Sequence, residues 1–201
     1  MNRRELKLRK DIVQVGQELY EKGLIVATDG NISGRLSNRL ILITPAGFCK
    51  GKLKQNEIVR LVIDKSIPKQ TQPKPSSEYL MHIMIYKARP EINAIIHAHP
   101  VFATAIASTP IGKISKDQLF HLSEFQPLVG KVAMIDYLPP GSKELAQAVA
   151  TEMTQANVVI MARHGVVVAN KNLTEAFFCL ERIELAAKLF ILTQLINQFS
   201  K

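Results

Sequence analysis

The segment Ala94-Ile95-Ile96-His97-Ala98-His99-Pro100 is an apolar run that ends in two histidines. Its apolar residues predict a short buried strand, because brief apolar runs next to turn residues are typical of strands inside a sheet. Side chains two positions apart on a strand point to the same face, so both imidazoles can reach one metal ion. The motif alone equally allows two histidines that are hydrogen-bonded at a strand end, and both interpretations stay open here.

A third histidine lies between two further apolar runs near the C-terminus. Residues 158–162 and 166–169 are rich in β-branched residues and predict two strands, with His164-Gly165 between them. Glycine at this place allows backbone or ligand to approach closely. Three neutral imidazoles with one open position form a catalytic zinc arrangement. His82 falls within a predicted helix, and we interpret it as an ordinary helical histidine.

The segment Pro75-Ser76-Ser77-Glu78 predicts the start of a helix that either serine can cap. A helix N-terminus with two hydroxyl groups is a candidate anion site. Glu78 either interacts favourably with the helix dipole or acts as an acid/base beside a metal. The turns at Gly30-Asn31 and Ala46-Gly47 are candidates for backbone contact with phosphate, although each turn taken singly is also explained as structural.

Hydrophobic periodicity predicts helices interleaved with clustered strands, hence an α/β or α+β fold with a central sheet covered by helices. The expected strands are residues 32–36, 40–44, 57–63, 94–97, 131–135, 158–162 and 166–169. The expected helices are residues 3–22, 101–107, 143–156, 172–199 and one that begins at Ser76 or Ser77. Residues 64–75 are expected to be an exposed loop, and residues 108–127 have no interpretable pattern. The length of 201 residues suits a single domain, 1–201.

Composition narrows the classes of function. The chain is 47% hydrophobic and 21% charged, as is usual for a globular protein, and its two cysteines are too few for a cysteine-based metal site. The net charge of +9 is spread along the chain, without the pattern of a nucleic-acid-binding module. No membrane-spanning run or export signal is visible, so we expect a cytoplasmic protein that contacts neither nucleic acid nor membrane.

The order of the separate motifs resembles the class II aldolase/adducin head family, which includes L-fuculose-phosphate aldolase. These motifs are Gly30-Asn31-Ile32-Ser33, Ile43-Thr44-Pro45-Ala46-Gly47, Pro75-Ser76-Ser77-Glu78, His97-Ala98-His99 and His164-Gly165. The resemblance implies a three-layer α/β/α fold with a central, largely antiparallel sheet. It also implies a homotetramer with sites at the subunit interfaces.

The resemblance implies a role for each matching residue. His97, His99 and His164 match the zinc ligands, with one Zn2+ per subunit. Glu78 matches the carboxylate that ligates the resting metal and serves as acid/base. The phosphate of a small phosphorylated sugar is expected to contact Gly30, Asn31, Gly47, Ser76 and Ser77.

Several departures from the aldolase pattern bear on the reaction. The threonine that usually precedes Gly47 is Ala46, and the tyrosine that follows the histidine matching His121 is Leu122. A second tyrosine, in the aldolases' C-terminal tail, is also missing. Glu124 offers a carboxyl group nearby, but a solvated or ion-paired Glu124 is the more ordinary interpretation.

The resemblance thus implies a zinc-dependent aldolase that cleaves a ketose 1-phosphate, similar to fuculose 1-phosphate, through a metal-stabilised enediolate. Its products would be dihydroxyacetone phosphate and an aldehyde. A sugar-phosphate dehydratase of the methylthioribulose-1-phosphate type or a 4-epimerase is the alternative on the same site. A non-enzymatic assembly module like the adducin head fits less well, because all three ligand positions are histidine.

Overall fold

The structure, a computed structural model, describes residues 2–67, 70–109 and 125–199. Its centre is a seven-stranded sheet in the order β3-β2-β1-β4-β7-β6-β5. The strands are β1 (Asn31–Ser37), β2 (Leu40–Ile43), β3 (Val59–Val62), β4 (Ala94–Ala98), β5 (Val132–Ile135), β6 (Val158–Met161) and β7 (Gly165–Asn170). Neighbouring strands pair antiparallel except β5 and β6, which run parallel.

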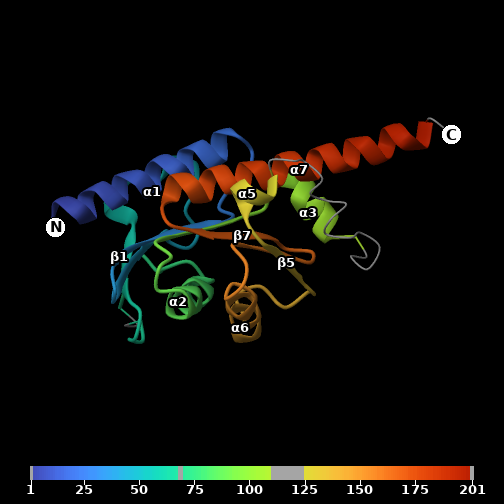
Figure 1. The fold of residues 1–201 in the computed structure, drawn as a ribbon. Helices are drawn as coiled ribbons and strands as arrows, with labels where there is room; N and C mark the ends of the chain where they lie inside the picture. The colour runs from blue at the N-terminus through green and yellow to red at the C-terminus, as the bar shows by residue number, and fades with distance from the viewer. Residues whose placement is uncertain (1, 68–69, 110–124, 200–201) are drawn as a thin grey trace.

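Helices cover both faces of this sheet (Figure 1). One face packs against α1 (Arg3–Glu21), α3 (Val101–Ala107), α5 (Phe125–Val129) and α7 (Leu173–Phe199). The other face packs against α2 (Tyr79–Ala88) and α6 (Lys143–Glu152). Short 3-10 turns at Lys50–Lys52 and Gln55–Glu57 lie between β2 and β3. The predicted three-layer α/β/α fold with a largely antiparallel sheet is therefore confirmed.

The central strand β4 shows why its sequence is apolar on both sides. Successive side chains of a strand point to opposite faces. Ile96 belongs to the core under α1 and α7, and Ile95 belongs to the core under α2 and α6. Both side chains are fully buried. Because β4 lies between β1 and β7, it has no edge exposed to water, and its C-terminal end carries His97 into the interior.

The N-terminus of α2 differs from the prediction. The helix begins at Tyr79, with Glu78 as its N-cap, and neither serine caps it. The Ser76 N–H donates instead to the carbonyl of Thr44 at 3.1 Å, and Pro75 forms a bridge with Pro45. These contacts keep residues 75–76 extended beside the end of β2, so the helix begins only after them. This arrangement puts Glu78, rather than a serine, at the helix end.

Other boundaries agree more closely. Ser142 caps α6 by accepting from the Leu145 N–H at 3.1 Å, and before α7 the Asn172 side chain accepts from the Glu175 N–H at 2.8 Å and donates to Glu175 Oε1 at 3.1 Å. The strand expected at residues 57–63 is shorter, because a 3-10 turn occupies Gln55–Glu57. α6 ends at Glu152, earlier than expected. Among the residues described, no helix combines the length and apolar character needed to cross a bilayer.

Truncation of the β4 side chains tests whether both faces of the sheet are covered. We expect Ile95→Ala and Ile96→Ala each to lower the free energy of unfolding by roughly 2–5 kcal/mol, because each change leaves a cavity in a different core. Denaturant titration of the two variants measures both values. A loss below about 1 kcal/mol at either position would contradict a sheet buried on both faces.

Candidate metal centre

Three histidines converge at the ends of neighbouring strands. His97 lies on β4, His99 follows β4 directly, and His164 lies in the connection from β6 to β7. One ring nitrogen from each lies within 4.8 Å of those of the other two. The ring centroids are 4.8 Å apart for His97 with either neighbour and 5.3 Å apart for His99 and His164. The alternative in which the His-x-His pair is only hydrogen-bonded at a strand end does not account for the third ring.

A backbone carbonyl selects which ring nitrogen of His97 carries hydrogen. Its Nδ1 lies 3.0 Å from the carbonyl oxygen of Val166, an acceptor only, so Nδ1 carries the proton and donates. In the neutral ring Nε2 then presents its lone pair, 3.1 Å from Glu78 Oε2 and 2.9 Å from His99 Nε2. Such a hydrogen bond from the distal nitrogen is typical of metal-binding histidines.

Glu78 brings a carboxylate to the same point. Its Oε1 lies 3.3 Å from His164 Nε2, and this oxygen has no hydrogen-bond partner among the described residues. Burial alone would raise the pKa of Glu78, but the interactions with His97 and His164 and the hydrogen bond from Asn31 outweigh it, and the pKa lies well below the usual range. The carboxylate is therefore ionised and faces ring nitrogens from two sides.

His99 and His164 are neutral at physiological pH. Burial, followed by the interaction with His97, lowers the pKa of His99 and of His164 to about 4 each. Neutral rings offer lone pairs to a cation. Three imidazoles and one carboxylate are ligands that suit a divalent ion such as zinc, although imidazole accepts several metals. The donor set therefore fits a metal ion.

The residues on either side of His164, Arg163 and Gly165, have unusual backbone requirements that position its ring. Arg163 has a φ of 55°, which few non-glycine residues adopt, and such conformations concentrate at functional sites. Its guanidinium lies over the Tyr137 ring, 4.4 Å from the centroid. A Cβ added to Gly165 would lie 2.5 Å from the Ala98 carbonyl oxygen and 2.7 Å from His99 Cδ2. Only glycine fits between the two strands here.

The predicted phosphate-binding turns meet at Thr44, which is fully buried. Its N–H donates to the Ile32 carbonyl at 3.0 Å, and its Oγ1 accepts from the Ile32 N–H at 3.1 Å. Its carbonyl accepts from the Ser76 N–H at 3.1 Å. Thr44 thereby joins the segment after Gly30 to the segment before Ser77, so residues far apart in sequence become neighbours.

The five predicted phosphate contacts are not equivalent in the structure. Gly47 has a φ of 75° and open space where a side chain would be, and Ser77 is exposed. Gly30 has a φ of 69° and packs against the His97 carbonyl, where a Cβ would lie at 2.7 Å. Asn31 donates to Glu78 Oε2 at 2.9 Å, and Ser76 Oγ accepts from the Glu78 N–H at 3.3 Å. Asn31 and Ser76 thus already hold Glu78.

Polar residues that the sequence interpretation missed surround this site. Asp29 Oδ2 lies 3.8 Å from His99 Nδ1. His82 is fully buried and hydrogen-bonded to Asn31, so its interpretation as an ordinary helical histidine is incomplete. The available signal was its position four residues after Glu78, which places both on one face of α2. His121, Leu122 and Glu124, which bear on the second acid/base, lie outside the described residues.

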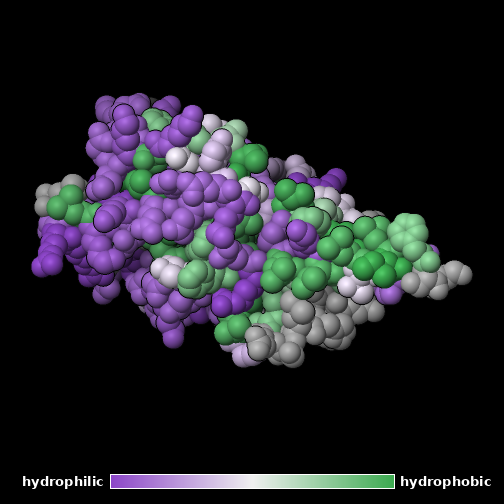
Figure 2. Space-filling view, turned by 90° about the horizontal axis from the view of Figure 1, so that it is seen from above, coloured by the Kyte–Doolittle hydropathy of each residue, from purple (hydrophilic) through white to green (hydrophobic). Residues whose placement is uncertain are grey.

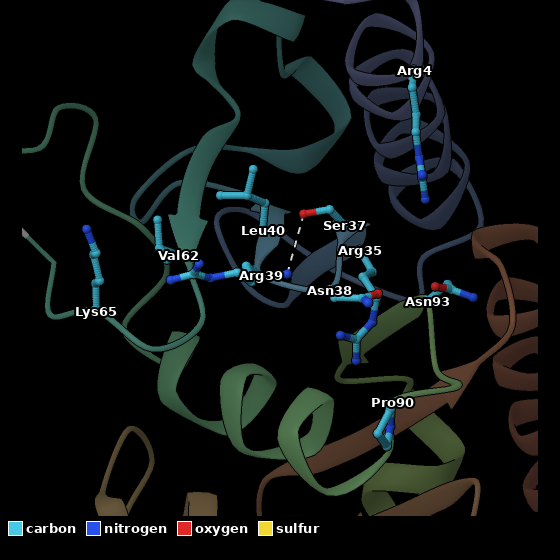
Figure 3. Close-up of a pocket in the computed structure, with 10 residues that line it drawn as sticks. All are labelled: Arg4, Arg35, Ser37, Asn38, Arg39, Leu40, Val62, Lys65, Pro90 and Asn93. Atoms are coloured by element: carbon cyan, nitrogen blue, oxygen red, sulfur yellow. Dashed lines mark hydrogen bonds between the residues drawn. The ribbon is translucent and has the colours of Figure 1, made fainter.

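A surface hollow of about 680 Å³ lies away from the histidine cluster (Figure 3). Basic side chains including Arg4, Arg39 and Lys65 surround it, and none of the predicted site residues lines it. It borders the start of β4 and the end of β1, whereas Asn31 pairs with His97 at the opposite ends of these strands. The hollow is therefore separate from the histidine cluster.

Substitution of Gly165 tests the close approach of the strands. We expect Gly165→Ala to weaken divalent-metal binding by about 10-fold or more, because the new methyl group would displace the His97 and His99 rings. Competition with a chelating dye measures this affinity. Gly34→Ala in β1 is the control, because its methyl group would meet only the flexible Leu8 side chain. Equal affinities of both variants and the unaltered protein would contradict the described packing.

Comparison with known proteins identifies the family of this chain. Residues 10–191 match the family described as Class II Aldolase and Adducin N-terminal domain. The L-fuculose phosphate aldolase of Methanocaldococcus jannaschii is 32% identical over 190 residues, 94% of this chain and 99% of that protein. The 3-oxo-tetronate 4-phosphate decarboxylase of Haemophilus influenzae is 32% identical over 194 residues, 94% of this chain and 90% of that protein.

Solved structures show the same fold. A putative aldolase/epimerase/decarboxylase from Escherichia coli superposes with a TM-score of 0.86 at 27% identity, covering 94% of this chain and 90% of that one. An L-fuculose 1-phosphate aldolase superposes with a TM-score of 0.78 at 30% identity, covering 94% and 87%. The chain belongs to the class II aldolase and adducin N-terminal domain family and carries a candidate three-histidine metal site typical of its enzymes.

Proposed function

We propose that the protein is a metal-dependent lyase that cleaves a ketose 1-phosphate to dihydroxyacetone phosphate and an aldehyde. The observation that carries this proposal is the convergence of the imidazoles of His97, His99 and His164, with the buried, ionised carboxylate of Glu78 against two of them. The similarity to L-fuculose phosphate aldolases over nearly the whole chain supports the reaction class. We propose zinc as the metal, because three histidines with one further position are a common catalytic zinc set.

His97, His99 and His164 would hold the ion, with Glu78 as the fourth ligand in the resting state. A divalent ion held there acts as a Lewis acid that stabilises negative charge on the substrate's carbonyl and neighbouring hydroxyl oxygens. His97 and Glu78 are buried, and charge interactions are stronger in such surroundings than in water.

Glu78 is the candidate acid/base. Asn31 and Ser76 hold one carboxylate oxygen and the backbone N–H of this residue, whereas Oε1 has no hydrogen-bond partner among the described residues. Oε1 is thus the atom available to take or return a proton. Aldol cleavage removes a proton from the hydroxyl beside the breaking bond and later returns a proton to the carbon released from it. We assign both transfers to Glu78, whose ionised Oε1 would take the hydroxyl proton and then deliver it to the carbon.

The substrate phosphate would contact Gly47 and Ser77 first, since these residues are open. Gly30, Asn31 and Ser76 complete the proposed phosphate-binding set, but Asn31 and Ser76 act mainly by orienting Glu78. The net charge of +9 also favours an anionic substrate.

Decarboxylation of a phosphorylated 3-oxo sugar acid is a second candidate reaction. Loss of carbon dioxide yields the same kind of enolate and then needs only one proton, delivered to carbon. No hydroxyl proton has to be removed in this reaction. Decarboxylation therefore does not require the aldolase tyrosine, which is leucine at position 122 here. The similarity to 3-oxo-tetronate 4-phosphate decarboxylases supports this alternative.

We also propose that the protein forms a homotetramer. The C-terminal half of α7 extends beyond the sheet and carries an apolar surface (Figures 1 and 2). Leu192, Leu195 and Phe199 are 41%, 45% and 88% exposed. Contact with other copies would remove this apolar surface from water.

Product analysis separates the two reactions. We expect metal-loaded protein to release dihydroxyacetone phosphate from a ketose 1-phosphate such as L-fuculose 1-phosphate. A panel that also contains 3-oxo-tetronate 4-phosphate and methylthioribulose 1-phosphate, read by mass spectrometry, identifies the products. Carbon dioxide release from the oxo acid alone would favour decarboxylation, and no cleavage of any carbon–carbon bond would contradict the proposal.

Removal of a ligand tests the metal requirement. We expect His97→Ala to lower turnover by at least 100-fold and metal content to near zero, because the remaining set loses its central nitrogen. Elemental analysis and the product assay measure both quantities. The exposed Lys171→Ala, remote from the cluster, is the control. A metal-free His97→Ala variant with full activity would refute the proposed mechanism.

A further inference from the structure

Two rows of polar side chains face each other where β1 packs against α2. They are Asn31, Ser33 and Arg35 on the strand, and Glu78 at the N-cap with His82 and Tyr86 on the helix, all buried. Two strand residues advance about 6.6–6.8 Å and four helix residues about 6 Å, so the rows stay in step along their length. Every second residue of β1 therefore meets every fourth residue of α2.

Four hydrogen bonds connect these rows in one line. Asn31 Nδ2 lies 2.9 Å from Glu78 Oε2, and His82 Nε2 lies 2.5 Å from Asn31 Oδ1. Ser33 Oγ lies 2.6 Å from His82 Nδ1 and 2.9 Å from the Tyr86 hydroxyl. The line runs from the metal centre along the buried face of β1.

The Glu78 carboxylate, at one end of the line, determines which group donates and which accepts in each hydrogen bond. The ionised carboxylate of Glu78 can only accept, so the Asn31 amide donates to it and its oxygen is left to accept from His82. His82 therefore carries its proton on Nε2. Burial, the largest cause, lowers the pKa of His82 to about 3, so the ring is neutral and its Nδ1 accepts from the Ser33 hydroxyl. Ser33 in turn accepts from Tyr86, and every donor points toward Glu78.

We infer that His82 is a positioning residue, which acts through Asn31 to hold the Glu78 carboxylate in the orientation that faces the metal. The inference rests on the proposed role of Glu78 as ligand and acid/base. A rotation of the Asn31 amide by 180° would turn its oxygen against the carboxylate. The Nε2–H of His82 opposes this rotation, because it would then meet the amide NH2 group instead of an acceptor.

The far end of the line is anchored by Arg35. Its guanidinium lies over the Tyr86 ring, 4.6 Å from the centroid, and its Nη2 donates to the Tyr86 carbonyl at 2.8 Å. Its Nε donates to the Ile92 carbonyl at 2.8 Å. These contacts fix Tyr86 against β1, so the hydroxyl that begins the line has a defined place.

A matched pair of amide substitutions tests the inference. In His82→Gln the new amide takes the place of Nε2 and can still donate to Asn31, whereas in His82→Asn it reaches only the place of Nδ1 beside Ser33. We expect His82→Asn to weaken divalent-metal binding by about 10- to 100-fold and His82→Gln to retain affinity within a few-fold. Zinc competition with a chelating dye measures both, with thermal unfolding as the check of folding.

Two further variants keep the test interpretable. Ile85→Ala truncates a fully buried neighbour on α2 that makes no bond in the line, and it should lower stability without changing zinc affinity. Ser33→Ala removes one hydroxyl with little change in volume and should weaken zinc binding several-fold. Loss of affinity in proportion to stability across all variants would show a merely structural role and overturn the inference.

The tautomer of His82 gives a readout that needs no substrate. Nitrogen-15 NMR of the imidazoles should show a protonated Nε2 and an unprotonated Nδ1 for His82; the reverse tautomer would overturn the inference. Glu78→Gln distinguishes a failure of the proposed role of Glu78 from a failure of the positioning role of His82. Unchanged zinc affinity in Glu78→Gln would contradict the proposed role of Glu78. A loss there, with equal affinities for Gln and Asn at position 82, would contradict the positioning role alone.

Discussion

The structure depends on the burial of one ionised carboxylate. Glu78 is 8% exposed, and an isolated charge at that depth is costly unless it is paired and hydrogen-bonded. Asn31 supplies a hydrogen bond, and the N-terminal end of α2 supplies a favourable dipole. Ring nitrogens of His97 and His164 lie 3.1 and 3.3 Å from its oxygens, and a divalent cation held among these groups would balance the negative charge.

The strands and their connections bring together the side chains that surround this carboxylate. The antiparallel register of β4 with β1 and β7 brings His97 beside Asn31 on one side and Val166 on the other. The short connection through Arg163 returns the chain so that His164 faces the same carboxylate. Because these strands are central and helices cover both faces of the sheet, packing holds in place the elements that carry these side chains.

Much of the fold and of the candidate site could be predicted from where the histidines lie relative to the apolar runs. His97, His99 and His164 each lie at the end of an apolar strand or just after it, so their convergence and the layered fold were accessible. The link between Asn31 and His82 was not, because it depends on how β1 packs against α2 across some 51 positions of sequence. The start of α2 was also misplaced, because the backbone of Thr44 keeps Ser76 extended, and no local helix signal reports such a contact.

X-ray absorption spectroscopy of the zinc-loaded protein at neutral pH tests the central claim most directly. The account predicts one zinc per chain with three imidazole nitrogens at about 2.0–2.1 Å and the remaining coordination by oxygen. Sulfur in the coordination shell, fewer than three imidazoles, or zinc bound only in non-stoichiometric amounts would contradict it.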